Sequence, residues 1–154
     1  MAESDAIEIL LVEDNPADAE LALHALKKSK LANRILHVHD GAEALDFLFC
    51  RGEYQNRRRD QRPWLVLLDL KLPKVDGLQV LKEIKSNAST KALPVVLMTA
   101  SAEERDLVAS YQLGVNSYIQ KPVNFTEFQE VVRQMGMYWL LVNKRPPEAA
   151  FLST

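Results

Sequence analysis

The chain has 154 residues, 47% of them hydrophobic, and a formal net charge of −2, which is the profile of one globular domain with a substantial core. This charge gives no reason to expect binding to nucleic acid or to an anionic membrane, and the single cysteine, Cys50, excludes an internal disulfide. The N-terminus lacks a signal-peptide pattern and no apolar run reaches the roughly 20 residues of a membrane span, so we expect a cytoplasmic protein.

Short apolar runs, typical of strands, alternate with amphipathic segments, typical of helices, along the whole chain. In chain order we expect a strand over 7–12, a helix over 16–29, a strand over 34–38, a helix over 42–51, a strand over 64–68, a helix over 77–86, a strand over 95–98, a helix ending near 114, a strand over 117–119 and a helix over 124–142. Strict alternation of five strands and five helices predicts an α/β fold, a doubly wound parallel sheet with helices on both faces.

Capping residues mark the start of several of these helices. Asn15 precedes the first helix, and Asp18 follows in its first turn, where the helix dipole favours an anion. Ser101 and Glu104 have the spacing of a capping box for the fourth helix, and Asn124 is expected to cap the last one.

Polar residues follow four of the five predicted strands. Glu13 and Asp14 come after the first strand, Asp69 after the buried run 64–68, Thr99 after the fourth strand and Lys121 after the fifth. The carboxyl ends of parallel strands meet at one edge of the sheet, which is where open α/β sheets bind ligands. A solvated loop explains any one of these residues, but it is a poor explanation for polar residues at the ends of four strands. Three carboxylates, a hydroxyl and an ammonium at one edge suit a Mg²⁺-dependent phosphoryl acceptor.

Each of these side chains fits a step of phosphoryl transfer. Asp69 is the candidate nucleophile, and it would become an acyl phosphate. Mg²⁺ prefers oxygen ligands, and adjacent residues point in different directions, so we expect Asp14 to bind the ion directly and Glu13 to act through water. Lys121 can pair with a phosphoryl oxygen, and Thr99 offers a hydroxyl donor.

These residues, in this order and spacing, resemble the receiver domain of bacterial two-component response regulators. The resemblance covers residues 7–142, nearly the whole chain. It rests on the acidic pair Glu13–Asp14, the segment Leu-Leu-Asp-Leu-Lys-Leu-Pro around Asp69 with Asp76–Gly77 after it, the segment Leu-Met-Thr-Ala at 97–100, and Lys121–Pro122.

The resemblance implies a metal and a phosphoacceptor. Asp69 would accept the phosphoryl group from a sensor histidine kinase. Mg²⁺ would be held by Glu13, Asp14 and Asp69, with the backbone carbonyl of Lys71 as a further ligand. The implied fold is flavodoxin-like, with the strand order 2-1-3-4-5.

The resemblance also implies a switch. Thr99 and Tyr118 would be the switch pair, and Lys121 would contact the phosphoryl group. Phosphorylation would then alter a surface formed by the fourth helix, fifth strand and fifth helix, for partner binding, dimerisation or onward phosphotransfer. The peptide bond between Lys121 and Pro122 would be cis.

A narrower resemblance concerns the arginine-rich segment before Asp69, which is longer than in a minimal receiver. This segment, together with the lack of an output domain, looks like the stand-alone receivers that serve bacterial phytochrome kinases. We expect an N-terminal tail at 1–6, the receiver at 7–142 and a C-terminal tail at 143–154. The arginines are explained most simply by a solvated loop, then by a partner contact or ion pairs, and least well by nucleic acid. They are Arg51, Arg57, Arg58, Arg59 and Arg62.

Two rival functions remain open. One is an aspartate-nucleophile phosphotransferase or phosphatase, although Lys71 stands where such phosphatases carry a second aspartate, and no segment is left for a substrate pocket. The other is an interaction module that works without phosphorylation. We favour the receiver, which catalyses only its own phosphorylation and dephosphorylation and is not a turnover enzyme.

Two further patterns stand out. An apolar stripe with helical spacing continues past the part of the last helix that a five-stranded sheet can cover, which predicts a homodimer. The alternative is that Pro146–Pro147 and Phe151 fold back over it. The stripe comprises Phe125, Phe128, Val132, Met135, Trp139 and the apolar residues at 141–142.

His37 and His39 share a face of the second strand. A metal pair is one interpretation, and an ordinary structural role is the simpler one.

Overall fold

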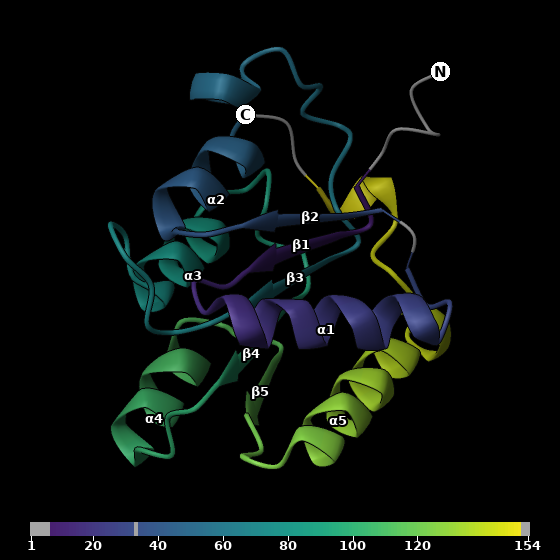
Figure 1. Ribbon diagram of the computed structural model, residues 1–154. Coiled ribbons are helices and arrows are strands. Elements are labelled where there is room, and N and C mark those ends of the chain that lie inside the picture. The colour runs from purple at the N-terminus through teal and green to yellow at the C-terminus, as the bar shows by residue number, and fades with distance from the viewer. Residues whose placement is uncertain (1–6, 33, 152–154) are drawn as a thin grey trace.

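The computed structural model describes residues 7–32 and 34–151, and a parallel five-stranded sheet forms its centre (Figure 1). The strand order is β2-β1-β3-β4-β5, which confirms the predicted fold class and topology. The strands are β1 (Ile9–Val12), β2 (Ile35–Val38), β3 (Leu65–Leu68), β4 (Val95–Thr99) and β5 (Ser117–Gln120). The expected N-terminal tail, 1–6, lies outside the described residues.

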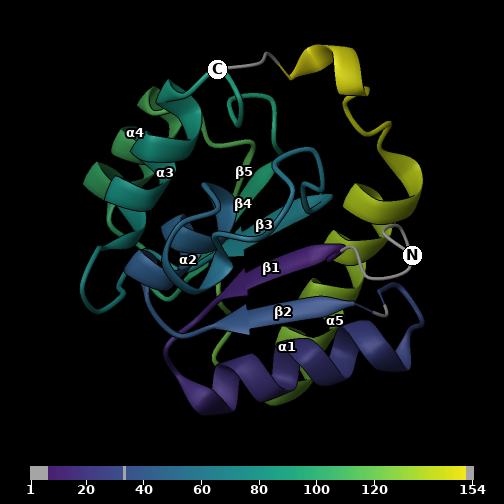
Figure 2. The same ribbon diagram turned by 90° about the horizontal axis from the view of Figure 1, so that it is seen from above.

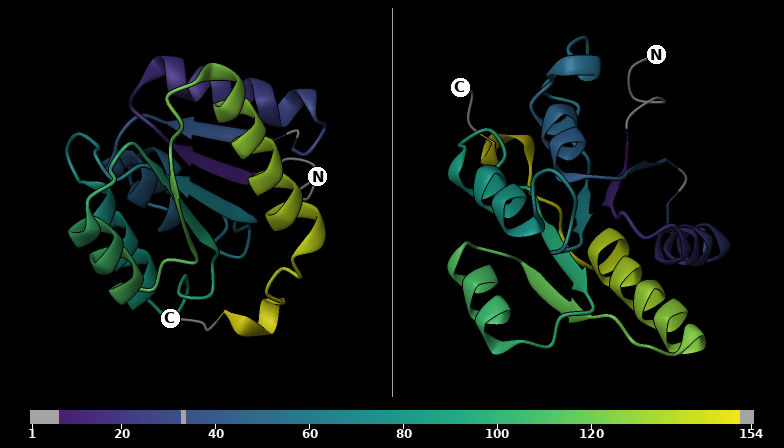
Figure 3. Two further views of the ribbon diagram at one scale, coloured as in Figure 1. Left: turned by 90° about the horizontal axis from the view of Figure 1, so that it is seen from below. Right: turned by 60° about the vertical axis from the view of Figure 1, so that its left-hand side comes forward.

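Helices cover both faces of the sheet. Helices α1 (Pro16–Lys28) and α5 (Phe125–Met137) lie on one face, and α2 (Gly41–Leu48), α3 (Gly77–Ser86) and α4 (Glu104–Gln112) lie on the other (Figure 3). Within the described residues, no helix combines the length and the apolar character that crossing a membrane requires.

The central strands are buried on both faces, which is why their sequences are almost wholly apolar. Leu10 and Val12 of β1 pack into the core beneath α2 and α3, whereas Ile9 and Leu11 pack beneath α1 and α5. Polar residues can therefore appear only where these strands end. Gly77 then brings α3 close to that edge, because a Cβ there would lie 2.1 Å from the backbone oxygen of Asp69.

Helix α2 ends three residues earlier than the sequence predicted. Cys50 adopts a left-handed conformation, with φ of 55°. The N–H of Arg51 donates to the Asp46 carbonyl at 2.8 Å, and the N–H of Cys50 donates to the Phe47 carbonyl at 3.4 Å. These two bonds form a Schellman motif, which glycine usually makes. A cysteine at the left-handed position hid the end of the helix from the sequence pattern.

The capping box predicted for α4 is wrong. Glu103 occupies the cap position and its side chain makes no capping hydrogen bond. Ser101 lies two residues before the cap position, and its hydroxyl donates to Asp106 Oδ2 at 2.5 Å and accepts from the Glu103 N–H. The caps predicted at Asn15 and Asn124 are confirmed.

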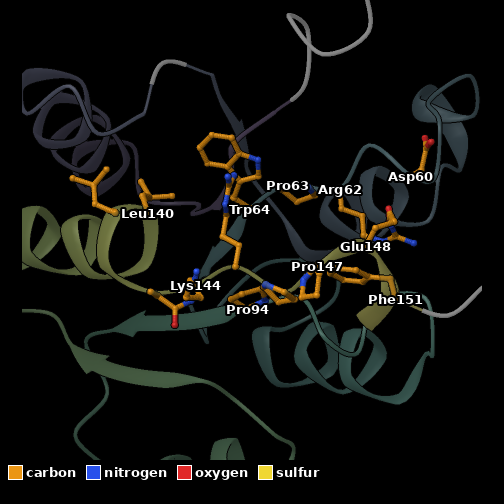
Figure 4. A pocket seen from close by; sticks show the side chains of 14 residues that line it. Asp60, Arg62, Pro63, Trp64, Pro94, Leu140, Lys144, Pro147, Glu148 and Phe151 are labelled. Atoms are coloured by element: carbon orange, nitrogen blue, oxygen red, sulfur yellow. The ribbon is translucent and has the colours of Figure 1, made fainter.

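The C-terminal segment turns back across the amino-terminal edge of the sheet. After α5 a π-helical turn spans Tyr138–Val142, and the chain then passes over the amino ends of the central strands (Figure 2). Glu148 and Phe151 both contact Arg62, by an ion pair of 2.6 Å and a ring-centroid distance of 4.3 Å, and Arg145 lies 3.7 Å from the Trp64 ring centroid. A pocket of about 560 Å³ lies between this segment and the sheet (Figure 4).

This segment does fold back, as the alternative to dimerisation expected, but it leaves part of the apolar stripe uncovered. Leu140 is buried, whereas Leu141 and Val142 are each 67% exposed. The stripe therefore still offers an apolar surface at the end of α5.

The arginine-rich segment is held largely by the chain itself. The Arg57 guanidinium lies 3.7 Å from the Phe47 ring centroid and donates to the backbone oxygens of Phe47 and Gln61. Arg62 donates to the Ser89 carbonyl at 3.1 Å and pairs with Glu148. For these two arginines the solvated-loop interpretation is wrong, and contacts within the chain explain the residues.

Candidate active site

The carboxyl ends of the strands bring the predicted residues together. Val12 of β1 is opposite Leu68 of β3, so the residues that follow them, Glu13 and Asp69, become neighbours. On the next pair of strands, the N–H of Lys121 donates to the Thr99 carbonyl at 2.7 Å. The sheet register therefore places all of the predicted catalytic groups at one edge.

Three carboxylates form a compact acidic cluster at this edge. Oxygen atoms of Glu13, Asp14 and Asp69 lie within 4.8 Å of one another. Glu13 and Asp69 are buried, at 5% and 8% exposure, whereas Asp14 is exposed. Buried carboxylates converging in this way supply the hard oxygen ligands that Mg²⁺ and Mn²⁺ bind. The donor set fits a divalent cation.

The Lys121 ammonium lies in the middle of the carboxylates. Its Nζ is 2.7 Å from Glu13 Oε1, 2.9 Å from Asp69 Oδ2 and 2.9 Å from Asp18 Oδ2. The Lys121 side chain is only 8% exposed, and its three N–H donors match three acceptors. The ammonium is thus fixed beside Asp69.

Asp18 is a site residue that sequence reasoning missed. It was explained by the helix dipole alone, and that explanation is incomplete because its carboxylate also binds Lys121. The available signal was spacing, since Asp18 lies one helical turn after Asp14 at the start of a helix that begins next to the acidic pair. Nothing in the sequence showed that this turn faces the end of β5.

Burial and charge shift the pKa values of two of these groups. Burial raises the pKa of Glu13 to about 7, although the hydrogen bond from Lys121 opposes the shift. Burial alone would lower the pKa of Lys121, but its hydrogen bonds with Glu13, Asp18 and Asp69 together raise it. The lysine is therefore a permanent cation, and Glu13 is the carboxyl that can hold a proton when no metal is bound.

Thr99 and Tyr118 meet at Ser101. The Thr99 hydroxyl, which is buried, accepts a hydrogen bond from the Ser101 N–H at 3.3 Å. The Tyr118 hydroxyl donates to the Ser101 carbonyl at 3.1 Å. Because both side chains bind the same residue of the β4–α4 loop, a displacement of Thr99 can be transmitted to Tyr118.

Comparison with known proteins identifies the family. The family sequence model of the response regulator receiver domain matches residues 9–133 of the chain. The chain belongs to the response regulator receiver family. Response regulator Rcp1 of Synechocystis sp. is 45% identical over 132 residues, which cover 86% of this chain and 88% of Rcp1.

Two solved structures have the same fold. The Mn²⁺-bound form of Rcp1 has a TM-score of 0.85 and is 42% identical, covering 92% of this receiver chain and 99% of Rcp1. The phosphorylated cyanobacterial phytochrome response regulator RcpA has a TM-score of 0.86 at the same identity and coverage. The acidic cluster of this receiver domain is consistent with divalent-metal binding, because a related receiver binds Mn²⁺.

One expectation drawn from the family resemblance is wrong. The described residues contain no cis peptide bond, so Lys121–Pro122 is trans, the form that X–Pro bonds ordinarily favour by about 0.5–1 kcal/mol. The trans bond does not prevent Lys121 from reaching Asp69 in this receiver.

Proposed function

We propose that this receiver accepts a phosphoryl group on Asp69, in a Mg²⁺-dependent reaction, from a sensor histidine kinase of the phytochrome type. The observation that carries the proposal is the position of the Asp69 carboxylate, which is buried at the end of β3 between Lys121 and the Glu13–Asp14 pair. The kinase class is proposed from RcpA, which is a phytochrome response regulator.

The residues have separate roles in the transfer. A carboxylate oxygen of Asp69 forms a bond to phosphorus as the bond from phosphorus to the kinase histidine nitrogen breaks, and the imidazole leaves. Lys121 remains charged and pairs with a phosphoryl oxygen. Mg²⁺, when bound, supplies charge neutralisation on the other phosphoryl oxygens. We assign the ion to Glu13, Asp14 and Asp69 and to the Lys71 carbonyl, with Asp14 as a direct ligand and Glu13 acting through water.

The output is a change of surface. A phosphoryl group on Asp69 draws the Thr99 hydroxyl away from the Ser101 N–H, and Tyr118, held by the same loop residue, follows. The surface affected includes exposed apolar side chains of α4 and the start of α5: Leu107, Val108, Tyr111 and Phe125. Partner binding, dimerisation and onward phosphotransfer are the outputs that this surface can serve.

The finer assignments follow from the same proposal. We place the receiver at 7–142 and a C-terminal tail at 143–154. We propose a homodimer through the exposed end of the α5 stripe, no function with nucleic acid or membranes, and no turnover of an external substrate. A cytoplasmic location stays a prediction.

The test is labelling with acetyl phosphate. Asp69→Asn keeps the shape of the side chain but removes the nucleophile, so Mg²⁺-dependent labelling should disappear while circular dichroism stays unchanged. Asp14→Ala should lose labelling as well, because it removes a direct metal ligand. The matched control is Asp60→Asn, which should label normally. Asp60 is an exposed carboxylate that pairs with Arg58 away from the site.

The outcome also separates the receiver from an aspartate-dependent phosphatase. A receiver ends with at most one phosphoryl group per chain, whereas a phosphatase releases many phosphates from an external monoester. Undiminished labelling of Asp69→Asn would refute the assignment of the phosphoacceptor.

A further inference from the structure

His37 contacts the backbone of the acidic pair, a contact that the receiver function leaves unused. It lies half-buried on the edge strand β2, and its Nε2 is 2.8 Å from the backbone oxygen of Glu13. The exposed His39 packs beside it, with ring centroids 4.3 Å apart and an interplanar angle of 55°. The two histidines thus do not have equivalent surroundings.

The chemistry of the contact fixes the direction of the hydrogen bond. A carbonyl oxygen only accepts, so Nε2 of His37 carries the hydrogen and donates. The last backbone bond between the ends of β1 and β2 is from the Glu13 N–H to the Val38 carbonyl, at 3.1 Å. The hydrogen bond from the His37 side chain to the Glu13 carbonyl is a further link between the ends of β1 and β2, past that backbone bond.

This bond holds the peptide unit from which the Asp14 carboxylate departs. The Glu13 carbonyl and the Asp14 N–H belong to one planar group, so fixing one fixes the other. Glu13 is additionally held through its side chain by Lys121 and by the Asn15 N–H. The Asp14 carboxylate has no hydrogen bond or ion pair among residues 7–32 and 34–151. Its direction therefore depends on its backbone.

We propose that His37 is a positioning residue for the divalent-metal site, acting by holding the Glu13–Asp14 peptide so that the Asp14 carboxylate faces Asp69. The inference rests on the proposed metal site and adds a residue that does not itself touch the ion. The inference assigns no such role to His39, because His39 has no contact with the acidic pair among the described residues.

The test is a Mn²⁺ titration of the whole chain, with free Mn²⁺ measured by its electron paramagnetic resonance signal. His37→Leu removes the donor and should weaken Mn²⁺ binding by about tenfold, at the lower end of what loss of a residue that orients metal ligands costs. His37→Gln places an amide N–H near the position of Nε2 and should restore binding to within about twofold of wild type. His39→Leu is the matched control and should bind Mn²⁺ as wild type does.

A second pair of variants covers a folding defect in His37→Leu. His37→Asn carries the same amide as His37→Gln but is one methylene too short to reach the Glu13 carbonyl. The inference requires the glutamine variant to bind clearly tighter than the asparagine variant. Equal affinities for these two, or wild-type affinity in His37→Leu, would overturn it.

Asp14→Ala separates this inference from the metal site itself. If Asp14→Ala binds Mn²⁺ poorly while His37→Leu binds normally, the metal site stands and the role of His37 fails. If Asp14→Ala binds Mn²⁺ as wild type does, the proposed site is wrong and the inference fails with it.

Discussion

Replacing Lys121 tests the electrostatics of the site most directly. Lys121→Met removes the ammonium but keeps a long unbranched side chain, so Glu13, Asp18 and Asp69 lose their shared cation. We expect a loss of unfolding free energy when no metal is present, because uncompensated carboxylates then remain at a buried edge of the sheet.

The magnitude follows from burial. Removing one member of a buried ion pair costs about 3–5 kcal/mol. Asp18 is the most exposed of the three carboxylates and Glu13 can hold a proton, so we expect the lower end, about 3 kcal/mol. For a chain of this length that is a fall of about 6–12 °C in Tm.

The assay is urea unfolding followed by circular dichroism, in EDTA and in excess MgCl₂. A bound cation takes over the neutralisation of Glu13 and Asp69. In MgCl₂, the difference in unfolding free energy between Lys121→Met and wild type should therefore shrink to less than about half of its value in EDTA. Lys85→Met is the matched control. The Lys85 Nζ donates to three neutral oxygens, the carbonyls of Lys91 and Leu93 and Oδ1 of Asn116, so its loss should cost the same in both buffers. An equal loss for Lys121→Met in EDTA and MgCl₂, or no loss at all, would refute the reasoning.

Three further predictions concern the metal, the switch and the dimer. The pKa of Glu13 is raised from 4.5 to about 7 on folding, so the folded state holds this proton more tightly than the unfolded state does. The resulting contribution to the free energy of unfolding is complete below about pH 4.5 and is lost as the pH rises through about 7. Without metal, the wild type should therefore be less stable in urea at pH 7 than at pH 5, and MgCl₂ added between these values should release a proton that calorimetry in two buffers can detect. In the wild type, beryllofluoride, which takes the place of the phosphoryl group on Asp69, should bury the Tyr118 ring. Thr99→Ala should still be labelled at Asp69 but should not show this burial; a ring that becomes buried in this variant would contradict the coupling through Thr99. Trp139→Glu should sediment as a monomer at tens of micromolar and keep normal labelling, whereas a monomeric wild type, with and without beryllofluoride, would contradict the proposed dimer.

The residues that sequence reasoning found are those whose position depends on strands alone. Buried strands of similar length end at one edge, so Asp69 and Lys121 could be placed together from the chain order without knowing any helix. Asp18 escaped because its place depends on the direction in which α1 leaves the sheet. Ser101 was assigned the wrong role because α4 begins two residues later than the capping-box spacing indicates, so its hydroxyl binds the Asp106 side chain in the first turn of α4 instead of capping the helix.

The course of the C-terminal segment was only partly predictable. A return of Pro146–Pro147 and Phe151 over the apolar stripe was considered only as the alternative to a dimer, and Arg62, the residue that holds the segment, lies 86 positions away from Glu148. A contact between distant segments leaves no local pattern in the sequence. Arg57 differs, because Phe47 lies only 10 positions before it, and the sequence did not show that the segment after α2 turns back over this ring.

The left-handed backbone at Cys50 has a practical consequence for measuring distances in this protein. Glycine accepts that conformation more readily than cysteine, so the chain can be freed of its only thiol at little cost to the fold, apart from the 3.4 Å contact with Arg57. A new cysteine at the exposed position Tyr138 would then be the single attachment point for a spin label. Distances between labels on two copies would report how the ends of α5 approach each other in solution.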